Sequence, residues 1–380
     1  MSPTSSRSRP RRERAILAGR LTRPAVEGGG LTELRLLAET AGAEVIGEVH
    51  QRRGPVRSST YLSKGKIDEV KALAAEAEAT LLLVDEDLSP GQNRNLEEDL
   101  KIKVVDRSGL ILDIFSRRAR SREARLQVEL AQLEYTLPRL TGMWEHLSRL
   151  GGGIGTRGPG ETQLEVDRRR IRERIAKLKR DLDRVVKERR VQRHGRRDLF
   201  KISLVGYTNA GKSTLFNTLT RSRVYVEDQL FATLDPTTRV FAPAPGVRAL
   251  LTDTVGFIRK LPPHLVASFR ATLEEVTEAD LLLHVVDAIE PDVSAHIRAV
   301  DTVLESIGAL TRPRLLVFNK VDALADDVVI LGLRAQYPGA VFVSAISREG
   351  IPDLKSAVRS RLEERASGGD RSAASRPGGS

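Results

Sequence analysis

Short runs of apolar residues alternate with helix-like stretches over residues 15–118. Apolar runs of strand length predict three strands, and the spacing of apolar positions between them is that of helices. The strands are predicted over residues 44–49, 80–84 and 102–105, and the helices over 32–41, 66–77 and 91–100. This alternation is typical of a small α/β unit with a mostly parallel sheet.

The pattern changes to long helices over residues 119–197. Apolar residues recur there at heptad-like steps in two series, one ended by Pro138: Leu126, Leu130, Leu133 and Leu137, then Leu164, Ile171, Ile175, Leu178, Leu182 and Val185. Two such helices in succession are expected to pair as a long antiparallel hairpin. Between them, six glycines within residues 149–160 exclude regular structure, so we expect a flexible glycine-rich loop at 151–160.

The α/β alternation returns over residues 198–365. Strands are predicted at residues 201–205, 247–251, 281–286, 315–318 and 341–343, with helices that begin near 212, 265, 293, 327 and 351. This is the pattern of a doubly wound, mostly parallel sheet. The ends of the chain, residues 1–14 and 366–380, are rich in Ser, Gly, Pro and Arg, and we expect them to be disordered tails.

The positive charge of the chain is concentrated in the predicted hairpin. The net charge is +11, and residues 116–198 hold 23 Lys and Arg against 12 Asp and Glu, an excess equal to that of the whole chain. A localised basic region of this kind is expected to bind a polyanion, usually nucleic acid. The alternative is a solvated helical surface, because arginine also solubilises helices.

Composition excludes several other classes of protein. The 380 residues include no cysteine, so neither disulfides nor a thiolate metal site can form. The basic N-terminus is followed by no apolar stretch of the signal-sequence kind, and the longest apolar runs are far too short to cross a membrane. We therefore expect a cytoplasmic protein.

A phosphate-binding loop lies where the predicted strand 201–205 runs into a helix. The loop reads GYTNAGKS and comprises Gly206, Tyr207, Thr208, Asn209, Ala210, Gly211, Lys212 and Ser213. Its glycines let the backbone wrap the phosphates, so that N–H groups and the helix N-terminus face the anion. Lys212 supplies positive charge to the β- and γ-phosphates, and Ser213 offers a hydroxyl to Mg²⁺. A chance glycine turn is the alternative, but strand, loop, Lys-Ser and helix coincide here.

Four further motifs follow in the order that a GTP-binding domain requires. In the second motif, Asp253 can hold Mg²⁺ through water and the N–H of Gly256 can meet the γ-phosphate. In the first motif, Thr233 closes over Mg²⁺. In the third motif, Asp322 can accept hydrogen bonds from both guanine N1–H and the N2 amine. The fourth motif can place a backbone N–H on guanine O6. The motifs are Phe231, Ala232, Thr233, Leu234 and Asp235; Asp253, Thr254, Val255 and Gly256; Asn319, Lys320, Val321 and Asp322; and Ser344, Ala345 and Ile346.

Two residues bear on the rate of hydrolysis. Phe257 stands where Ras-like GTPases carry a water-orienting glutamine, so intrinsic hydrolysis should be slow or the catalytic group must come from elsewhere. Asn209 is the P-loop asparagine of GTPases in which K⁺ replaces an arginine finger, which suggests K⁺ activation. We assign catalytic contributions to Lys212, Thr233, Gly256 and Asn209.

The glycine-rich segment also matches the Gly-x-Gly-x-x-Gly dinucleotide fingerprint at residues 153–158. It follows a helical stretch instead of a strand, and no acidic residue ends a second strand about 20 positions later, so a Rossmann site is disfavoured. Two alternatives remain, a plain flexible connector and a mobile loop whose bare backbone approaches RNA. Arg149 and Arg157 beside the glycines favour the second.

Taken together, these motifs resemble those of the HflX-type GTPases, ribosome-associated relatives of the Obg group of translational GTPases. The resemblance spans nearly all of residues 14–365 and involves no departure in the nucleotide motifs. It is carried by residues 206–217, 230–239 and 253–258, by the GGGIGTRGPGETQLE segment, and by residues 63–66 in the first domain.

The resemblance implies an N-terminal α/β subdomain, a helical hairpin and then the GTPase domain. It also implies GTP-dependent binding to the large (50S) ribosomal subunit, with the helical region on 23S rRNA, and a role in splitting or rescuing stalled ribosomes. We expect a monomer that uses Mg²⁺. The candidate rRNA contacts are Arg149, Arg157, Arg168, Arg169 and Arg170.

Two other functions remain open. One is an RNA-remodelling ATPase or RNA-binding protein with a second nucleotide site in the N-terminal domain, although residues 14–115 contain no complete Walker A motif. The other is a signalling GTPase that binds no RNA.

Overall fold

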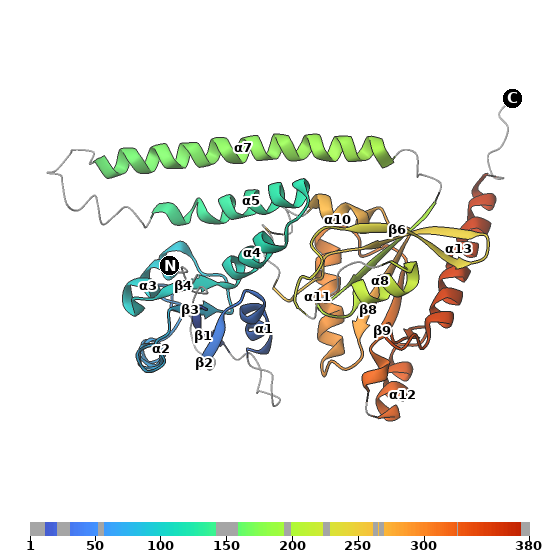
Figure 1. Ribbon diagram of the computed structural model, residues 1–380, viewed down its shortest axis with the longest axis horizontal. Coiled ribbons are helices and arrows are strands. Elements are labelled where there is room, and N and C mark those ends of the chain that lie inside the picture. The colour runs from blue at the N-terminus through green and yellow to red at the C-terminus, as the bar shows by residue number, and fades with distance from the viewer. Residues whose placement is uncertain are drawn as a thin grey trace, which may run out of the picture. The chain divides into compact units, whose positions relative to one another are not determined.

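A computed structural model describes residues 12–20, 31–51, 57–141, 159–193, 199–222, 229–260, 265, 270–324 and 326–373. The chain divides into two compact units, Met1–Arg117 with Val128–Arg180, and Arg118–Gln127 with Asp181–Ser380. The short segment Arg118–Gln127 therefore belongs with the second unit, although the chain continues from it into the first (Figure 1).

The first unit contains a four-stranded, fully parallel sheet of order β2-β1-β3-β4. Its strands are β1 (Arg14–Arg20), β2 (Glu44–Gln51), β3 (Leu81–Val84) and β4 (Lys103–Asp106), and its helices are α1 (Thr32–Thr40), α2 (Lys64–Glu76), α3 (Pro90–Leu100) and α4 (Arg107–Arg118). The small parallel α/β unit that the sequence predicts is confirmed, and β1 and α4 are additions to it.

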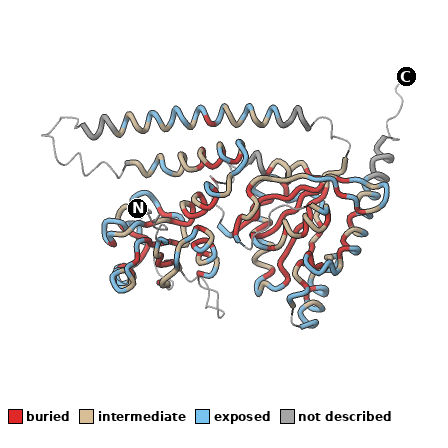
Figure 2. Tube along the Cα trace, in the orientation of Figure 1, coloured by how far each residue is buried: buried red, intermediate tan, exposed pale blue. Residues whose placement is uncertain are grey.

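Apolar runs in these strands form the core of the first unit. All four residues of β3 are buried, as expected for a central parallel strand that is covered on both faces. Figure 2 shows the buried positions following the strands and the inner faces of the helices. The core residues include Ile16, Ala18, Val70, Leu82, Val84, Leu96 and Val104.

The two long helices predicted for the basic region are α5 (Arg122–Thr136) and α7 (Pro159–Arg193), with a 3-10 turn, η1 (Arg139–Thr141), after α5. Within the first unit they run side by side in opposite directions (Figure 1). Leu130 and Leu178 of the predicted apolar series are buried, and the flanks are joined by ion pairs such as Arg174 to Glu129 at 2.6 Å. Exposed pairs of this kind contribute little, so the apolar seam supplies most of the pairing free energy.

Helix α7 begins earlier than the sequence indicates. The glycine-rich loop is expected at residues 151–160, yet Pro159 and Gly160 belong to the first turn of α7. A proline at this position has no N–H to leave unpaired and its fixed φ fits a helix, which explains the earlier start. The remaining residues of the loop, 151–158, lie outside the described residues.

The second unit contains a six-stranded sheet of order β10-β9-β8-β5-β7-β6, in which only β6 is antiparallel to its neighbour. Its strands are β5 (Phe200–Gly206), β6 (Thr237–Ala244), β7 (Val247–Asp253), β8 (Leu281–Asp287), β9 (Arg314–Asn319) and β10 (Val341–Phe342). The doubly wound, mostly parallel sheet expected from the sequence is confirmed, and β6 is an additional edge strand formed as a hairpin with β7.

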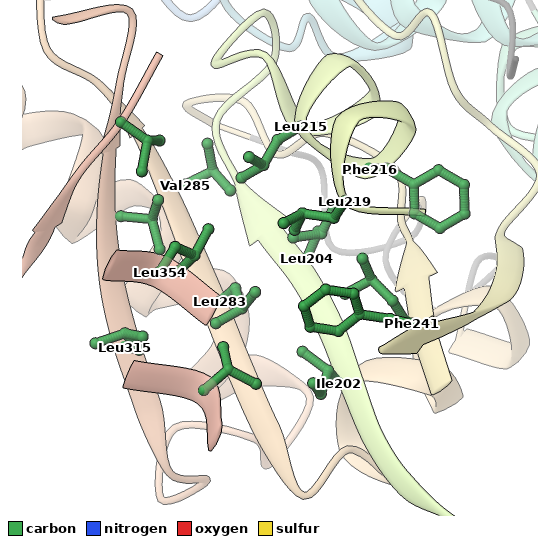
Figure 3. Packing of buried hydrophobic residues seen from close by; sticks show 14 of the residues in the cluster. Ile202, Leu204, Leu215, Phe216, Leu219, Phe241, Leu283, Val285, Leu315 and Leu354 are labelled. Carbon is green, nitrogen blue, oxygen red and sulfur yellow. The ribbon is translucent and has the colours of Figure 1, made fainter. Parts of the chain in front are cut away.

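Helices cover both faces of this sheet, and the main core lies between the strands and α8 and α13 (Figure 3). The helices and the 3-10 turn are α8 (Lys212–Thr220), α10 (Arg270–Thr277), α11 (Val293–Ser306), η3 (Val321–Ala323), α12 (Asp327–Gln336) and α13 (Ile351–Ala373). Helix α13 continues to Ala373, past residue 365, where the domain is expected to end. In this core Phe216 of α8 and Phe241 of β6 are fully buried.

No helix in the described part of the chain is long and apolar enough to cross a membrane.

Candidate nucleotide-binding site

The P-loop connects β5 to α8, and two of its glycines are required by neighbouring strands. A Cβ at Gly206 would collide with the backbone carbonyl of Val285 in β8. Gly211 precedes the first residue of α8 with φ +85°, and a Cβ there would collide with the side-chain amide of Asn319. No side chain caps this helix N-terminus, so its first N–H groups are available to an anion.

Lys212 lies beneath the loop with its ammonium group pointing at backbone carbonyls. Its side chain is 6% exposed, and Nζ donates to the carbonyls of Gly206 at 3.1 Å and Tyr207 at 2.7 Å. Burial lowers the pKa of Lys212 to about 8, and the negative charge of Asp253 opposes that shift. A phosphate would place further negative charge beside this buried cation.

Three oxygen-bearing side chains from separate segments meet at one point. Ser213 Oγ donates to Asp253 Oδ2 at 2.6 Å and lies 2.8 Å from Thr233 Oγ1, which is 3.1 Å from Asp253 Oδ2. Asp253 is fully buried, and its Oδ1 has no hydrogen-bond partner. Burial raises the pKa of Asp253, while Ser213, Lys212 and Thr233 oppose the rise. Hydroxyls and a desolvated carboxylate are ligands that Mg²⁺ prefers, so these residues fit that ion.

The Asp-x-x-Gly segment is fixed against the P-loop by its backbone. Phe257 N donates to the carbonyl of Gly206 at 3.0 Å, and Thr208 N donates to the carbonyl of Phe257 at 2.7 Å. Gly256 lies so close that a Cβ would stand 2.8 Å from Thr208 and 3.1 Å from Lys212 Nζ. The Phe257 side chain is fully buried, so its position as well as its chemistry prevents it from orienting a water molecule. Behind Gly256, Thr254 donates to the carbonyl of Leu204 at 2.5 Å.

Asn319, at the end of β9, joins two parts of the expected guanine site. Its Nδ2 donates to the carbonyl of Ala210 in the P-loop at 3.0 Å, and its Oδ1 accepts from Ala345 N at 3.0 Å. Lys320 has φ +65°, and its Nζ lies 2.6 Å from Asp287 at the end of β8. Asp322 follows in η3 with an exposed side chain, and its contact with the base stays a prediction.

The segment 344–346, which is expected to contact guanine O6, is bonded to Asn319 at the end of β9. The backbone N–H of Ala345 donates to Asn319, so it already has a partner, and Ser344 is buried and accepts from Ser347 N at 2.9 Å. Ile346 is 78% exposed. The guanine O6 contact assigned to this segment stays a prediction.

An open cleft lies between the P-loop and the segment that carries Thr233. Thr214 and Gln229 line the cleft and were not singled out from the sequence. Thr214 could have been found because it directly follows the P-loop serine, whereas nothing in the pattern marks Gln229. The other lining residues are Thr208, Asn209, Gly211, Lys212, Ser213, Phe231, Ala232, Thr233, Thr254 and Gly256.

Several expected ligand residues have packing roles in this structure. Tyr207 is 7% exposed, stacks on His296 at a centroid distance of 3.9 Å, and accepts from Arg259 N. Ala210, Leu234, Val255 and Val321 are buried.

Asp235 is not among the residues that line the cleft. Its carboxylate accepts from the backbone N–H groups of Arg120 and Ser121 at the start of α5. In this structure Asp235 contacts another segment of the same unit, and the nucleotide contact expected of it stays a prediction.

The candidate RNA contacts are only partly visible. Arg149 and Arg157 lie outside the described residues. On α7, Arg169 and Arg170 are exposed, Arg168 is half-buried, and Arg170 lies 3.8 Å from Asp167.

Three family descriptions match consecutive parts of the chain. They read "GTP-binding GTPase N-terminal" over residues 29–116, "GTP-binding GTPase Middle Region" over residues 118–196, and "50S ribosome-binding GTPase" over residues 201–320.

Relatives with known names are similar over most of their length. GTPase HflX of Caldanaerobacter subterraneus subsp. tengcongensis is 50% identical over 353 residues, which cover 92% of this chain and 81% of the relative. GTPase HflX of Escherichia coli is 49% identical over 335 residues, 87% of this chain and 79% of the relative. Among solved structures, a GTP-binding protein from Sulfolobus solfataricus in complex with GDP is 26% identical, with a TM-score of 0.46. The match covers 93% of this chain and 99% of that protein.

Proposed function

The chain belongs to the HflX family of GTPases, and we propose that it is a GTP-dependent switch that binds the large ribosomal subunit. As a GTP hydrolase it converts GTP to GDP and phosphate. The single observation that carries the proposal of a ribosomal partner is the match of residues 201–320 to a 50S ribosome-binding GTPase.

The distribution of charge supports an RNA partner. The excess of 11 positive charges in residues 116–198 lies in the helical region. In α7, Arg169, Arg170, Arg172, Lys177 and Arg180 have exposed side chains. Each cation that neutralises a phosphate releases counterions, so a helix of this kind binds RNA with a strong dependence on salt.

We assign the steps of hydrolysis to residues that meet in the cleft. Lys212 and the N–H groups at the start of α8 hold the phosphates, and the N–H of Gly256 contacts the γ-phosphate. Ser213 and Thr233 would hold Mg²⁺ directly and Asp253 through water, and the ion would neutralise charge that develops on the phosphates. Because Phe257 is buried, the group that orients the attacking water comes from outside this position.

The bound nucleotide then controls whether the protein binds its ribosomal partner. GTP orders the segments around Thr233 and Asp253 and favours the ribosome-bound conformation, and hydrolysis releases these segments so that the protein dissociates. We propose that contact with the ribosome accelerates hydrolysis, and that the bound state splits or rescues stalled ribosomes. We further propose that it acts in the cytoplasm, as a monomer on 23S rRNA.

Asn209 supports a dependence on K⁺. Its side chain is exposed at the P-loop, lines the cleft and belongs to a residue with φ +63°. An amide oxygen at this position can hold a monovalent cation beside the phosphates. Turnover measured in K⁺ and in Na⁺ tests the idea, because equal rates would exclude it.

Co-sedimentation with purified ribosomal subunits tests the proposed partner. The full-length chain is incubated with 50S subunits and a non-hydrolysable GTP analogue, GDP or no nucleotide, over a range of salt concentrations. We expect binding with the analogue, weaker binding with GDP, and loss of binding as salt increases. Absence of binding with the analogue at low salt would rule the ribosomal role out.

A pair of variants locates the RNA surface. Arg169→Glu with Arg170→Glu reverses two exposed charges on α7, and Lys71→Glu with Lys101→Glu reverses two exposed charges elsewhere in the same unit. The first variant is expected to lose 50S binding while keeping basal GTP hydrolysis, and the second to keep both. Equal loss in the two variants would indicate a non-specific effect of net charge.

A further inference from the structure

The chain segment that leads into α5 contacts both ends of the segment that carries Thr233. Arg118 donates to the side chain of Gln229, and Asp235 accepts from the backbone N–H groups of Arg120 at 3.2 Å and Ser121 at 3.0 Å. All of these residues belong to the second compact unit. Thr233, two residues before Asp235, therefore lies between two anchored positions.

We propose that Ser121 is a positioning residue for GTP hydrolysis, which holds Asp235 and through it places Thr233 at the metal site. The inference rests on GTP hydrolysis alone and does not depend on ribosome binding.

The contact has the form of a helix cap shared between two segments. Ser121 Oγ accepts from Ala124 N at 3.0 Å and so caps α5, while the same hydroxyl donates to Asp235 Oδ1. In a capping box, a carboxylate or amide three residues after the cap would accept from the cap's own N–H, but alanine occupies that position here. Asp235 supplies this acceptor from outside the helix, where the N-terminal end of the helix dipole favours a negative charge.

The consequence for Thr233 follows from its own contacts. Its hydroxyl lies 2.8 Å from Ser213 Oγ and 3.1 Å from Asp253 Oδ2, so the conformation of the segment 229–235 in this structure completes the metal site. A segment without anchors would lose conformational entropy each time it reached this conformation. Anchoring Asp235 and Gln229 reduces that loss of conformational entropy. The anchors therefore stabilise the state of the protein in which Thr233 completes the metal site.

The arrangement also connects the helical region with the nucleotide site. Helix α5 is continuous from Arg122 to Thr136, and Ser121, which holds Asp235, directly precedes its first turn. A ligand that moves this turn would change the position of Thr233 without any contact with the P-loop.

Steady-state kinetics of the full-length chain test the proposal. The variants are Ser121→Ala, Asp235→Ala and the double variant, with kcat, KM and the half-saturating concentration of Mg²⁺ as readouts, and GDP affinity from a fluorescent analogue. We expect each single variant to lower kcat or raise the Mg²⁺ requirement by about threefold to tenfold, the range of one charge-assisted hydrogen bond at a partly exposed site. GDP affinity should change by less than about twofold, because GDP does not use Thr233.

Three comparisons separate positioning from simple loss of a helix cap. Ser121→Thr keeps the hydroxyl and should retain wild-type kinetics. Ser89→Ala removes an equivalent cap from α3, where Ser89 accepts from Gln92 N, and should leave kcat and the Mg²⁺ requirement unchanged. If α5 tolerates no alanine, Ser121→Gly removes the hydroxyl while keeping a residue that caps helices well.

The double variant provides the decisive measurement. If Ser121 acts through Asp235, the double variant should be no worse than the more impaired single variant. The proposal is overturned if the two effects multiply, if Ser121→Ala matches the wild type, or if GDP affinity falls in parallel with kcat.

Discussion

Asn319 fills the space in which a side chain at Gly211 would have to lie. The amide of Asn319 donates to the carbonyl of Ala210 at 3.0 Å, and the same group occupies the position of a Cβ on Gly211. One side chain at the end of β9 therefore fixes the P-loop backbone, while its carbonyl oxygen accepts from Ala345. The phosphate-binding and base-binding parts of the site are thus joined through Asn319.

This relationship predicts that Gly211→Ala abolishes nucleotide binding. The new Cβ would displace Asn319 and the loop together, and we expect GDP affinity to fall by more than about a hundredfold, which corresponds to about 2.8 kcal/mol. Gly246→Ala is the matched control, because Gly246 has a similar φ of +79° but open space around it. It should cost only the strain of a left-handed residue, about 1–2 kcal/mol of stability, and leave GDP affinity unchanged. Equal effects of the two variants on nucleotide binding would contradict the prediction.

Asp322 predicts a change of base preference. Its exposed carboxylate follows Asn319 on the same loop, and we expect it to accept two hydrogen bonds from guanine. Asp322→Asn replaces one acceptor by a donor, so GTP should bind at least about tenfold more weakly, whereas xanthosine triphosphate, with a carbonyl in place of the amine, should bind more tightly. Competition binding with the two nucleotides measures the change. An equal loss for both would argue against a direct contact with the base.

The burial of Phe257 predicts that a glutamine there will not restore a fast intrinsic reaction. The side chain is fully buried, and the backbone on both sides is paired with the P-loop. Phe257→Gln buries an amide without an evident partner and should lower the free energy of unfolding by about 1–3 kcal/mol, with no gain in turnover. Phe257→Leu keeps an apolar side chain and should retain activity. A marked rise in intrinsic turnover of the glutamine variant would show that the side chain can reach the γ-phosphate.

The sequence predicts those parts of the site whose chemistry is local. Lys212 and Ser213 follow a buried strand and open a helix, so their roles can be inferred from eight consecutive residues. The contact of Ser121 with Asp235 joins positions 114 residues apart. Ser121 belongs to no motif, and the motif that contains Asp235 does not indicate this partner. Periodicity identifies which face of an element is buried but not which distant segment it meets, so the contact of Asp235 with Ser121 cannot be predicted from the sequence.

The same limit applies to elements of the fold. The edge strand β6 has only two buried residues, Phe241 and Pro243, and pairs only with β7. Its apolar signal is therefore weak compared with that of β8, where all seven residues are buried. Helix α4 was missed for another reason. Its first residue, Arg107, is almost fully buried by ion pairs with Asp85 and Glu33, a charge network that no hydrophobic pattern predicts.

His284 predicts a pH dependence of stability in the second unit. It lies in the middle of β8, 1% exposed, and its Nδ1 has no hydrogen-bond partner. Burial lowers the pKa of His284 to about 3, and Arg314 and Lys212 add to the shift. The folded protein therefore keeps this histidine neutral while the unfolded chain protonates it below about pH 6.5.

Stability should consequently fall as pH decreases from about 6.5, because the unfolded state binds the additional proton. The contribution of His284 is about 1.4 kcal/mol per pH unit, or about 2 kcal/mol at pH 5, and none above about pH 7.5. Urea unfolding of the wild type and of His284→Leu at about pH 8 and about pH 5 measures it. At about pH 8, the difference in unfolding free energy between the two proteins reports packing alone. At about pH 5, this difference should shift by about 2 kcal/mol in favour of the leucine variant. Parallel pH profiles of the two proteins would mean that His284 is already protonated, or paired, in the folded state.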